Sequence, residues 1–382
     1  MEGTTLPRHF CSNKINNQKY NIFSFIPKVL YNEFKFFFNM FFLIIAISQF
    51  VPFLKVGFLF TYIAPLAFVL MVTMIKEAWD DINRYRRDKE LNNTQYAVLQ
   101  RGSGLIVPIA SKDIKVGQII KITQGQRVPA DLILFKTTEA SGNVFIKTDQ
   151  LDGETDWKLR KAIPFTQRQE DAFLVHNDGD YVLADPPNDQ IYKFMGQYVS
   201  NSGDREKEGL SLENTIWANT VLASPGYILG MVVHTGVETR MAMNASAPRM
   251  KVGVLDLEVN WLSKVLFVMM IGFSMAIIAA DGFYGDWYFK FFRVILLLCA
   301  IIPISMRINL DFAKLFYKVK IETDEDIKGT IARNSTIPEE LGRIQFLLSD
   351  KTGTLTQNDM IFKKISMEFA QYGEDDLDEM KH

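Results

Sequence analysis

The sequence predicts an α+β membrane protein of several domains, in which four membrane-spanning helices carry a β-rich soluble insert and lead into the start of an α/β domain. Three observations support this fold class. Long uncharged runs occur in two pairs, a stretch of short β-branched runs lies between the pairs, and an apolar segment near the end leads directly into "SDKTGTLT". At 382 residues the chain is also long enough for more than one hydrophobic core.

The first pair of uncharged runs extends from Phe36 to Leu54 and from Val56 to Ile75. Each run approaches the roughly 20 apolar residues that a helix needs to cross a bilayer, and "QFVPFLK" at their junction can only form a tight turn. The second pair, Val265 to Ala280 and Val294 to Met306, is shorter, so buried core helices are an alternative there. The aromatic-rich turn "DGFYGDWYF" between these two runs favours a second membrane hairpin.

Basic residues flank the runs and predict that the amino terminus and the insert face the cytosol. These residues are Lys14, Lys19, Lys28 and Lys35 before the first run, Arg84, Arg86, Arg87 and Lys89 after the second, and Lys314, Lys318 and Lys320 after the fourth. The polar first twenty residues have no apolar centre, so we do not expect a secretory signal. The expected parts are a cytosolic amino-terminal segment (1–33), a membrane hairpin (34–78), the insert (79–260), a second hairpin (261–318) and the start of the α/β domain (319–382).

Composition excludes some classes of function. The formal net charge is −2, which gives no support to a role in binding nucleic acid. Cys11 and Cys299 are far apart, and the four histidines are scattered. We therefore expect neither a disulfide framework nor a cysteine metal site.

The insert begins with five short runs typical of strands, separated by Gly, Pro and Asp: "YAVLQ", "GLIVPIA", "QIIKIT", "DLILF" and "NVFIKT". They predict a small β domain. Next comes "DQLDGETDWKLR", where Asp152, Gly153, Glu154 and Thr155 form a tight acidic loop. Gly153 is expected to take a positive φ, and an ordinary solvated turn is the alternative to a functional loop.

Near the end, "RIQFLLSD" predicts a buried strand over Ile344–Leu348 that ends in Ser349 and Asp350. A carboxylate at the carboxyl end of a strand, followed by a glycine-containing loop, stands where open α/β sheets bind ligands. Lys351 adds positive charge, and Thr352 and Thr354 supply hydroxyl and backbone groups suited to phosphate oxygens. Asp350 is therefore a candidate nucleophile that would form an aspartyl-phosphate.

Thr352 stands where haloacid-dehalogenase-type phosphatases generally carry a second acidic residue that serves as general acid and base. Without a carboxylate at that position, we expect the acyl-phosphate to last until another group activates water.

The chain resembles a P-type ATPase, and more narrowly the phospholipid-translocating branch, the flippases. Asp350–Thr356 resemble the phosphorylation motif of these pumps, and Asp152–Thr155 resemble the flippase version of the actuator-domain dephosphorylation loop. The segments "SLENTIWANT", "KVGVLDLEVN" and "RNSTIPEELGRIQFLLSDKTGTLTQNDM" are similar to the monomeric Golgi and endosomal branch. The resemblance extends from about Val29 to the end of the chain.

The resemblance implies that the insert is an actuator domain, whose Glu154 orients the attacking water after a domain movement. It implies that residues 319–382 hold the first strand of a truncated haloacid-dehalogenase-like phosphorylation domain. ATP and Mg²⁺ are the implied cofactors, with Asp350 and Thr352 as metal ligands and the nucleotide-binding domain absent from this chain. A phospholipid substrate, a Golgi or endosomal membrane and independence from the accessory glycoprotein subunit are also implied.

The fourth run, "IIPISMRINLD", favours lipid over ions as cargo. Pro303 interrupts the helix, with Ile304 and Ser305 beside the break in place of the carboxylate or cysteine that a bare cation needs. A simple kink is the alternative interpretation of Pro303. We expect Arg307 to attract a lipid phosphate, with snorkelling to the interface as the alternative.

Ser48 and Gln49 end the first expected membrane span, where flippases place headgroup-selecting residues, and a structural role is equally compatible with the sequence.

Two functional hypotheses remain from the sequence. In the first, the chain is the amino-terminal portion of an ATP-driven phospholipid pump and is inactive alone. In the second, it is a truncated non-catalytic membrane protein or a partner that associates with another pump. A cation pump of another P-type class is disfavoured by "PISM".

Overall fold

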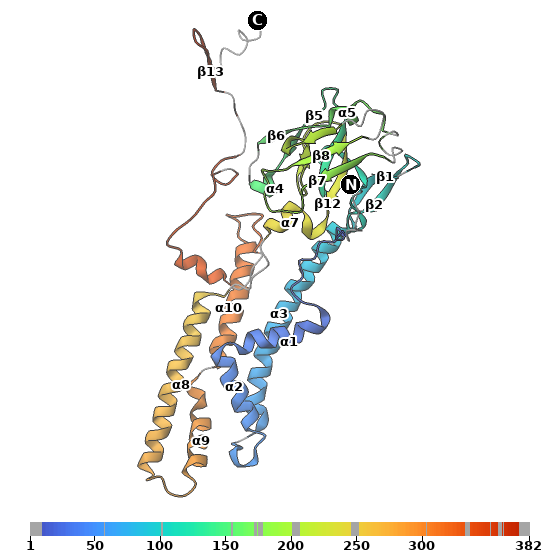
Figure 1. Cartoon of the computed structure of the whole chain (residues 1–382). Helices are drawn as coiled ribbons and strands as arrows, with labels where there is room; N and C mark the ends of the chain where they lie inside the picture. The colour runs from blue at the N-terminus through green and yellow to red at the C-terminus, as the bar shows by residue number, and fades with distance from the viewer. Residues whose placement is uncertain are drawn as a thin grey trace. The chain divides into compact units, whose positions relative to one another are not determined.

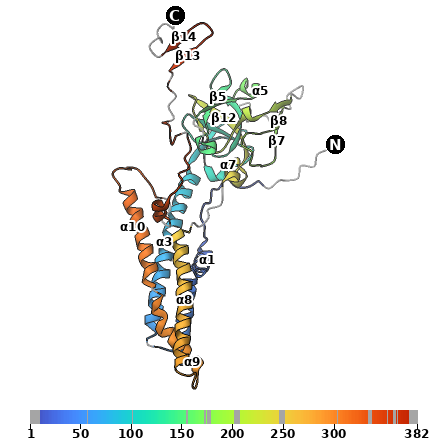
Figure 2. The same cartoon turned by 90° about the vertical axis from the view of Figure 1, so that its left-hand side faces the viewer.

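The computed structural model describes residues 10–56, 58–100, 102–153, 156–171, 174, 179–200, 207–245, 252–302, 304–332, 337–351, 353–357, 361 and 363–373, without the side chains of Ile304, Ser305 and Arg307. The chain divides into two compact units (Figures 1 and 2). We call residues 1–15, 90–246 and 347–382 the β-rich unit, and residues 16–89 and 247–346 the helical unit.

The β-rich unit is built on a six-stranded antiparallel sheet with the order β10-β4-β12-β3-β1-β2. Its strands are β1 (Gln95–Leu99), β2 (Ile106–Ala110), β3 (Ile119–Thr123), β4 (Asp131–Thr137), β10 (Thr215–Ile216) and β12 (Tyr227–His234). A second sheet, β11-β5-β6, contains β5 (Asn143–Lys147), β6 (Trp157–Lys161) and β11 (Val221–Leu222), and a third, β7-β8-β9, contains β7 (Tyr181–Ala184), β8 (Gly196–Val199) and β9 (Lys207–Leu210). All five runs that predicted strands form strands, so the predicted β-rich character of the insert is confirmed.

Strand β4 is buried on both faces, and both of these faces are apolar. Side chains alternate between the faces of a strand, so Leu132 and Leu134 enter one core while Ile133 and Phe135 enter the other. These two cores cover opposite faces of the sheet. A continuous apolar run such as "DLILF" is the pattern expected of a strand covered on both sides.

The first described residues pack onto the β-rich unit, which the sequence did not predict. Asn13 is buried, and its side-chain nitrogen donates to the carbonyl oxygens of Ser111 (2.9 Å) and Pro129 (3.1 Å). Its side-chain oxygen accepts from the backbone N–H of Gly236 at 2.9 Å. The amino-terminal segment is thereby fixed to loops that are distant in the sequence.

A buried charge cluster lies beside β4. The fully buried side chain of Arg240 donates to both carboxylate oxygens of Asp185 (2.9 and 3.1 Å), and its Nη1 lies 3.8 Å from Asp131 Oδ2. The Arg240 guanidinium stacks over the Trp217 ring at 4.0 Å. Asp131 accepts the backbone N–H groups of Ala218 (2.9 Å) and Arg240 (3.0 Å). These contacts tie β4 to short helix α7 (Arg240–Asn244).

His234, at the end of β12, borders this cluster and predicts a pH dependence. Burial, followed by the nearby Arg240 charge, lowers the pKa of His234, while burial raises the pKa of Asp131 to about 6. As the pH falls through about 6.5, the unfolded chain therefore protonates His234 more readily than the folded chain does, which weakens folding. Asp131 has the opposite effect on stability. Its raised pKa means that, as the pH falls, the folded chain binds this proton more readily than the unfolded chain does.

We expect the stability advantage of the wild type over a His234→Gln variant to shrink as the pH falls from about 7.5 to about 5.5. Both proteins contain Asp131, so the comparison isolates the histidine. Urea unfolding followed by amide hydrogen exchange in β12 measures the difference at each pH. An advantage that grows on acidification would show that the imidazolium is stabilised in the folded protein.

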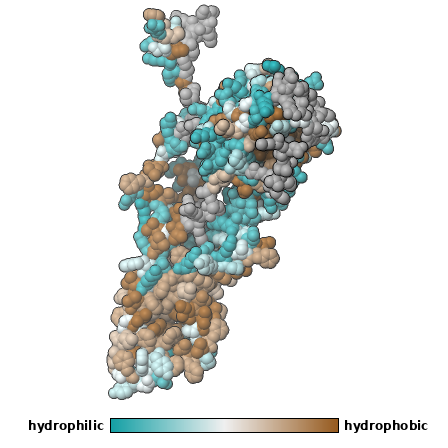
Figure 3. Space-filling view, viewed as in Figure 1, coloured by the Kyte–Doolittle hydropathy of each residue, from teal (hydrophilic) through white to brown (hydrophobic). Residues whose placement is uncertain are grey.

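The helical unit contains α1 (Ile22–Phe34), α2 (Phe37–Ser48), most of α3 (Leu59–Asn93), α8 (Val254–Ala280), α9 (Trp287–Leu298) and α10 (Ile304–Glu322). Its core joins Phe38, Phe41 and Phe42 of α2 to Met270 of α8 and Leu296 of α9. The hydrophobic surface in Figure 3 lies over α2, α3, α8 and α9. Helices that are apolar on their outer surface as well as inside are typical of a lipid environment.

Two helices in the described part of the chain, α3 and α8, are by themselves long and apolar enough to cross a membrane. Helices α1 and α2 are long and apolar enough to cross a membrane only if they are counted as one span, and this span is bent by 102°. The fourth predicted run is divided between α9 and α10, with η5 (Cys299–Ile301) between them. These helices therefore support a membrane protein, whereas the presence of four spans stays a prediction.

The structure corrects one predicted element. Residues 344–350 form no strand, and Phe346, Leu347 and Leu348 are exposed by 84%, 83% and 95%. An apolar strand of a parallel sheet requires partner strands and covered faces, and the described residues provide neither around this segment. Conversely, the hairpin of β13 (Lys364–Ser366) and β14 (Gln371–Gly373) was not predicted.

Candidate functional site

The predicted nucleophile, Asp350, lies at the start of a short exposed turn. Its Oδ1 accepts the backbone N–H of Lys351 at 2.8 Å, which holds the carboxylate against the chain. The N–H of Leu355 donates to the Lys351 carbonyl at 3.0 Å and closes the turn. Asp350, Lys351 and Thr354 are all exposed, whereas Thr352 lies outside the described residues. An exposed carboxylate in a closed turn is accessible to a phosphoryl donor.

The acidic loop lies between β5 and β6 and is held by Asp152. This residue ends α4 (Asp149–Asp152); its side chain is 4% exposed, accepts from the Thr148 hydroxyl at 2.9 Å and pairs with Lys158. Gly153 follows with φ 76°, as predicted, so the chain turns sharply after the anchored aspartate. Asp152 is thus engaged in holding the loop. Glu154 and Thr155 lie outside the described residues.

The two loops approach each other within the β-rich unit. A side-chain Cβ placed on Gly153 would lie 3.6 Å from Oδ2 of Asp350. Nearly two hundred residues separate these positions in the sequence. The structure therefore brings the glycine of one predicted site loop to the predicted nucleophile of the other.

The donors around Asp350 are consistent with a partial Mg²⁺ site. Mg²⁺ is usually bound by one or two carboxylates, with water and substrate phosphate completing an octahedron. Asp350 supplies one such carboxylate. In the described part of the chain, no group of three or more His, Cys, Asp or Glu side chains could hold a metal ion. Asp350 would supply one carboxylate to such an ion.

The predicted lipid path coincides with a break between helices. After η5, Ile302 has an extended backbone, and α10 begins at Ile304. Cys299 and Ile302 are buried against α2 and α8. Pro303 and the side chains of Ile304, Ser305 and Arg307 lie outside the described residues, so their roles stay predictions.

Ser48 and Gln49 are buried at the end of α2, where they stabilise its turn into α3. The Ser48 hydroxyl donates to the Ile45 carbonyl at 2.6 Å and accepts from Gln49 Nε2 at 3.1 Å. The Gln49 side-chain oxygen accepts the backbone N–H of Val56 at 3.0 Å. These bonds provide a structural reason for two buried polar residues, and a role in lipid selection stays a prediction.

Sequence reasoning missed a buried ionic cluster that anchors the segment leading to Asp350. Lys314 of α10 is 2% exposed, and its Nζ lies 2.7 Å from Asp256 Oδ2 and 3.1 Å from Glu339 Oε1. Glu339 belongs to η6 (Pro338–Arg343), whose Arg343 forms two bonds with Glu258 at 2.8 and 3.0 Å. Lysine and acidic residues are common on the exposed surfaces of helices, so the sequence offered no signal for this pairing.

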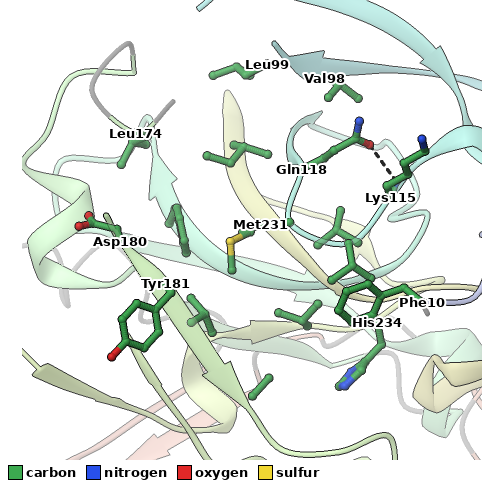
Figure 4. A pocket seen from close by; sticks show the side chains of 18 of the residues that line it. Phe10, Val98, Leu99, Lys115, Gln118, Leu174, Asp180, Tyr181, Met231 and His234 are labelled. Carbon is green, nitrogen blue, oxygen red and sulfur yellow. Dashed lines mark hydrogen bonds between the residues drawn. The ribbon is translucent and has the colours of Figure 1, made fainter. Parts of the chain in front are cut away.

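A cavity of about 910 Å³ in the β-rich unit lies apart from these loops. Figure 4 shows side chains of β1, β7 and β12 around it, including Leu99, Tyr181 and Met231. Asp350 and Gly153 are not among its lining residues. Two of its acidic residues already have partners, since Asp180 accepts from Ser200 and Asp185 pairs with Arg240. The cavity is therefore not part of the predicted phosphorylation site.

The chain is similar to known proteins over nearly its whole length, including both loops. Residues 2–63 match the family model described as "Phospholipid-translocating ATPase N-terminal". The chain is 50% identical over 372 residues to the "Probable phospholipid-transporting ATPase IIB" of Bos taurus and 50% identical over 370 residues to the "Phospholipid-transporting ATPase NEO1" of Saccharomyces cerevisiae. Each match covers 97% of this chain and 32% of the relative. The "Probable phospholipid-transporting ATPase tat-5" of Caenorhabditis elegans is also 50% identical, over 97% of this chain and 34% of that protein.

The chain belongs to the phospholipid-transporting ATPase family. It spans about a third of the length of the relatives that it matches. Family membership accordingly comes from an alignment that covers the helices, the β-rich unit and Asp350 together.

Proposed function

We propose that this chain is part of an ATP-driven phospholipid pump in which Asp350 carries the phosphoryl group. The approach of Gly153 to Asp350 carries the proposal, because it joins a loop that would bind phosphate to a loop that would release it. The names of the relatives, which are phospholipid-transporting ATPases, support a lipid substrate and the use of ATP.

Two displacements at phosphorus make up the proposed cycle. A carboxylate oxygen of Asp350 attacks the γ-phosphorus of ATP, a new O–P bond forms, and the bond to the bridging oxygen breaks as ADP leaves. Later, a water oxygen attacks the same phosphorus while Glu154 accepts its proton. The bond from phosphorus to the carboxylate oxygen breaks, which releases inorganic phosphate and restores Asp350. Bound Mg²⁺ would offset the negative charge of the phosphate.

The groups around Asp350 have distinct proposed tasks. Lys351 contributes positive charge, and Thr352 and Thr354 contribute hydroxyl or backbone groups to the phosphate oxygens. Asp152 positions the loop through Thr148 and Lys158, so it acts through Glu154 without touching the phosphate.

The lipid would move past the break between α9 and α10. We propose that Ile304 and Ser305 border this path, that Arg307 attracts the lipid phosphate, and that Ser48 and Gln49 contribute at the turn after α2. A Golgi or endosomal membrane and operation without an accessory subunit also belong to this proposal, on the resemblance of the sequence to that branch.

Replacing Asp350 with asparagine in the full-length protein should abolish labelling by γ-³²P-ATP. The labelled wild type should be stable in acid and cleaved by hydroxylamine, as an acyl-phosphate is. Glu154→Gln should become labelled normally but lose the label at least tenfold more slowly in a chase with unlabelled ATP, because water attack lacks its base. The exposed Asp326→Asn variant is the matched control and should behave as wild type. Labelling that survives in Asp350→Asn would refute the proposal.

A further inference from the structure

Helix α1 has an apolar face that the rest of the helical unit does not cover. Ile22 is 91% exposed, Phe23 93% and Ile26 56%. At about 100° per residue, Phe23 and Ile26 fall on one side of the helix, together with Pro27 and Leu30. Exposed apolar side chains grouped on one helix face mark an interaction surface.

The opposite side of α1 is polar. Ser24, Lys28 and Asn32 follow one another at intervals of four residues and therefore form a stripe. A third, narrower side packs inward, where Val29 and Glu33 are 2% and 3% exposed. The helix is thus held along one edge and presents an apolar face and a polar face in opposite directions.

The junction between α1 and α2 is a fixed bend. The two helices meet at 102°. The Asn39 side chain donates to the carbonyl (3.0 Å) and the carboxylate (3.1 Å) of Glu33, and the backbone N–H of Phe37 donates to Asn260 at 2.8 Å. Since the bend is built from buried hydrogen bonds, α1 does not continue the direction of α2.

We propose that α1 lies along the surface of the bilayer and buries its Phe23 face among the lipid headgroups and upper acyl chains. Helix α2 packs with α3 and α8, which are long and apolar enough to cross a membrane, so a helix bent by 102° from α2 would lie near the membrane plane. A polar face opposite an apolar face fits that position. Figure 3 shows hydrophobic surface on α1 beside the level where the hydrophobic surface of α2 and α3 ends. Lys28, together with Lys35 stacked on Tyr31 at 4.6 Å, provides positive charge for anionic headgroups.

The occupant of this face is therefore a lipid surface that is continuous with the membrane around α2. The inference requires that the helical unit is embedded in a membrane, and it does not require phosphorylation of Asp350. Failure of the following test would leave the proposed pump cycle untouched.

The test uses the full chain in vesicles of phosphatidylcholine with about one fifth phosphatidylserine. Cys11 and Cys299 are replaced by serine and alanine, and a fluorescent probe is attached at Phe23→Cys, at Lys28→Cys or at Ile44→Cys within α2. Quenching by iodide reports water, quenching by a nitroxide near the top of the acyl chain reports the interface, and quenching by a nitroxide near its end reports the bilayer centre.

The probe at position 23 should be quenched at least threefold more by the shallow nitroxide than by the deep one, and weakly by iodide. The probe at position 28, on the polar stripe, should be quenched mainly by iodide, and the probe at position 44 mainly by the deep nitroxide. Equal iodide quenching at positions 23 and 28 would place α1 in water and overturn the proposal. Strongest deep quenching at position 23 would show a membrane span and would also overturn it.

A second measurement uses unlabelled wild-type protein, so that it does not depend on the cysteine variants. A lipid with a photoreactive group beside its headgroup should crosslink to peptides that contain Ile22–Ile26. Crosslinks restricted to α2, α3 and α8 would contradict the proposal.

Discussion

Replacing Arg240 with leucine is expected to lower the free energy of unfolding of the β-rich unit by about 3–5 kcal/mol, the usual penalty for removing one partner of a buried ion pair. The substitution leaves Asp131 and Asp185 without their cation, and Asp131 is fully buried. It also removes the guanidinium that stacks on Trp217. Exchange of backbone amides in β4 and β12 should accelerate by two to four orders of magnitude, because about 1.4 kcal/mol corresponds to a factor of ten.

Two controls separate the charge cluster from a general effect of losing an arginine. Arg168→Leu changes an exposed arginine of the same unit and should leave exchange within about threefold of wild type. Arg240→Lys keeps the charge but loses the planar fork and the stacking, so it should give an intermediate effect. If Arg240→Leu exchanged no faster than Arg168→Leu, the cluster would not stabilise the unit.

Replacing Lys314 with methionine is expected to release η6 from the helices and to weaken the local structure by about 3–5 kcal/mol. Lys314 is the cation between Asp256 and Glu339, and both oxygens of Glu339 are buried. Removal of Lys314 places two buried carboxylates side by side without a counter-charge. Amides of Glu339–Arg343 and of the first turn of α8 should exchange at least a hundredfold faster in the reconstituted chain.

A triple variant distinguishes the loss of charge pairing from the loss of packing. Lys314→Met combined with Asp256→Asn and Glu339→Gln removes all three charges and should recover most of the protection, because neutral side chains no longer repel. Lys320→Met changes an exposed lysine of the same helix and serves as the control. If the triple variant were as unprotected as the single variant, packing of the lysine stem would account for the effect.

The Lys314 cluster also bears on the proposed cycle. The chain runs from η6 through residues 344–349 to Asp350. Lys314 pairs with Glu339 and thereby holds η6, where the segment that carries the predicted nucleophile begins.

Much of the architecture follows from local patterns. The uncharged runs determine which segments become α2, α3, α8 and α9, and the β-branched runs determine β1 to β5. The two site loops were predicted for the same reason: Gly153 and Gly353 both adopt positive φ, as short turns beside Asp152 and Asp350 require. Such features depend on residues that are close in the sequence, where propensity and spacing are informative.

Other features arise only when distant residues meet. The apolar run Ile344–Leu348 has the local pattern of a strand, yet it is exposed because a strand needs hydrogen-bonding neighbours and covering faces. Likewise, Arg240 and Lys314 are ordinary basic residues in the sequence, and their burial is possible only because Asp131, Asp185, Asp256 and Glu339 are brought around them.

The sequence by itself thus determined the long apolar helices, the strands of the β-rich unit, the motif at Asp350 and the turn at Gly153. The tertiary structure decided the approach of Gly153 to Asp350, the docking of Asn13, the bend between α1 and α2 and the pairing of buried charges. The physical reason is range: hydrophobic periodicity and backbone propensity act over a few residues, whereas ion pairs and hydrogen bonds between distant segments exist only after the chain has folded.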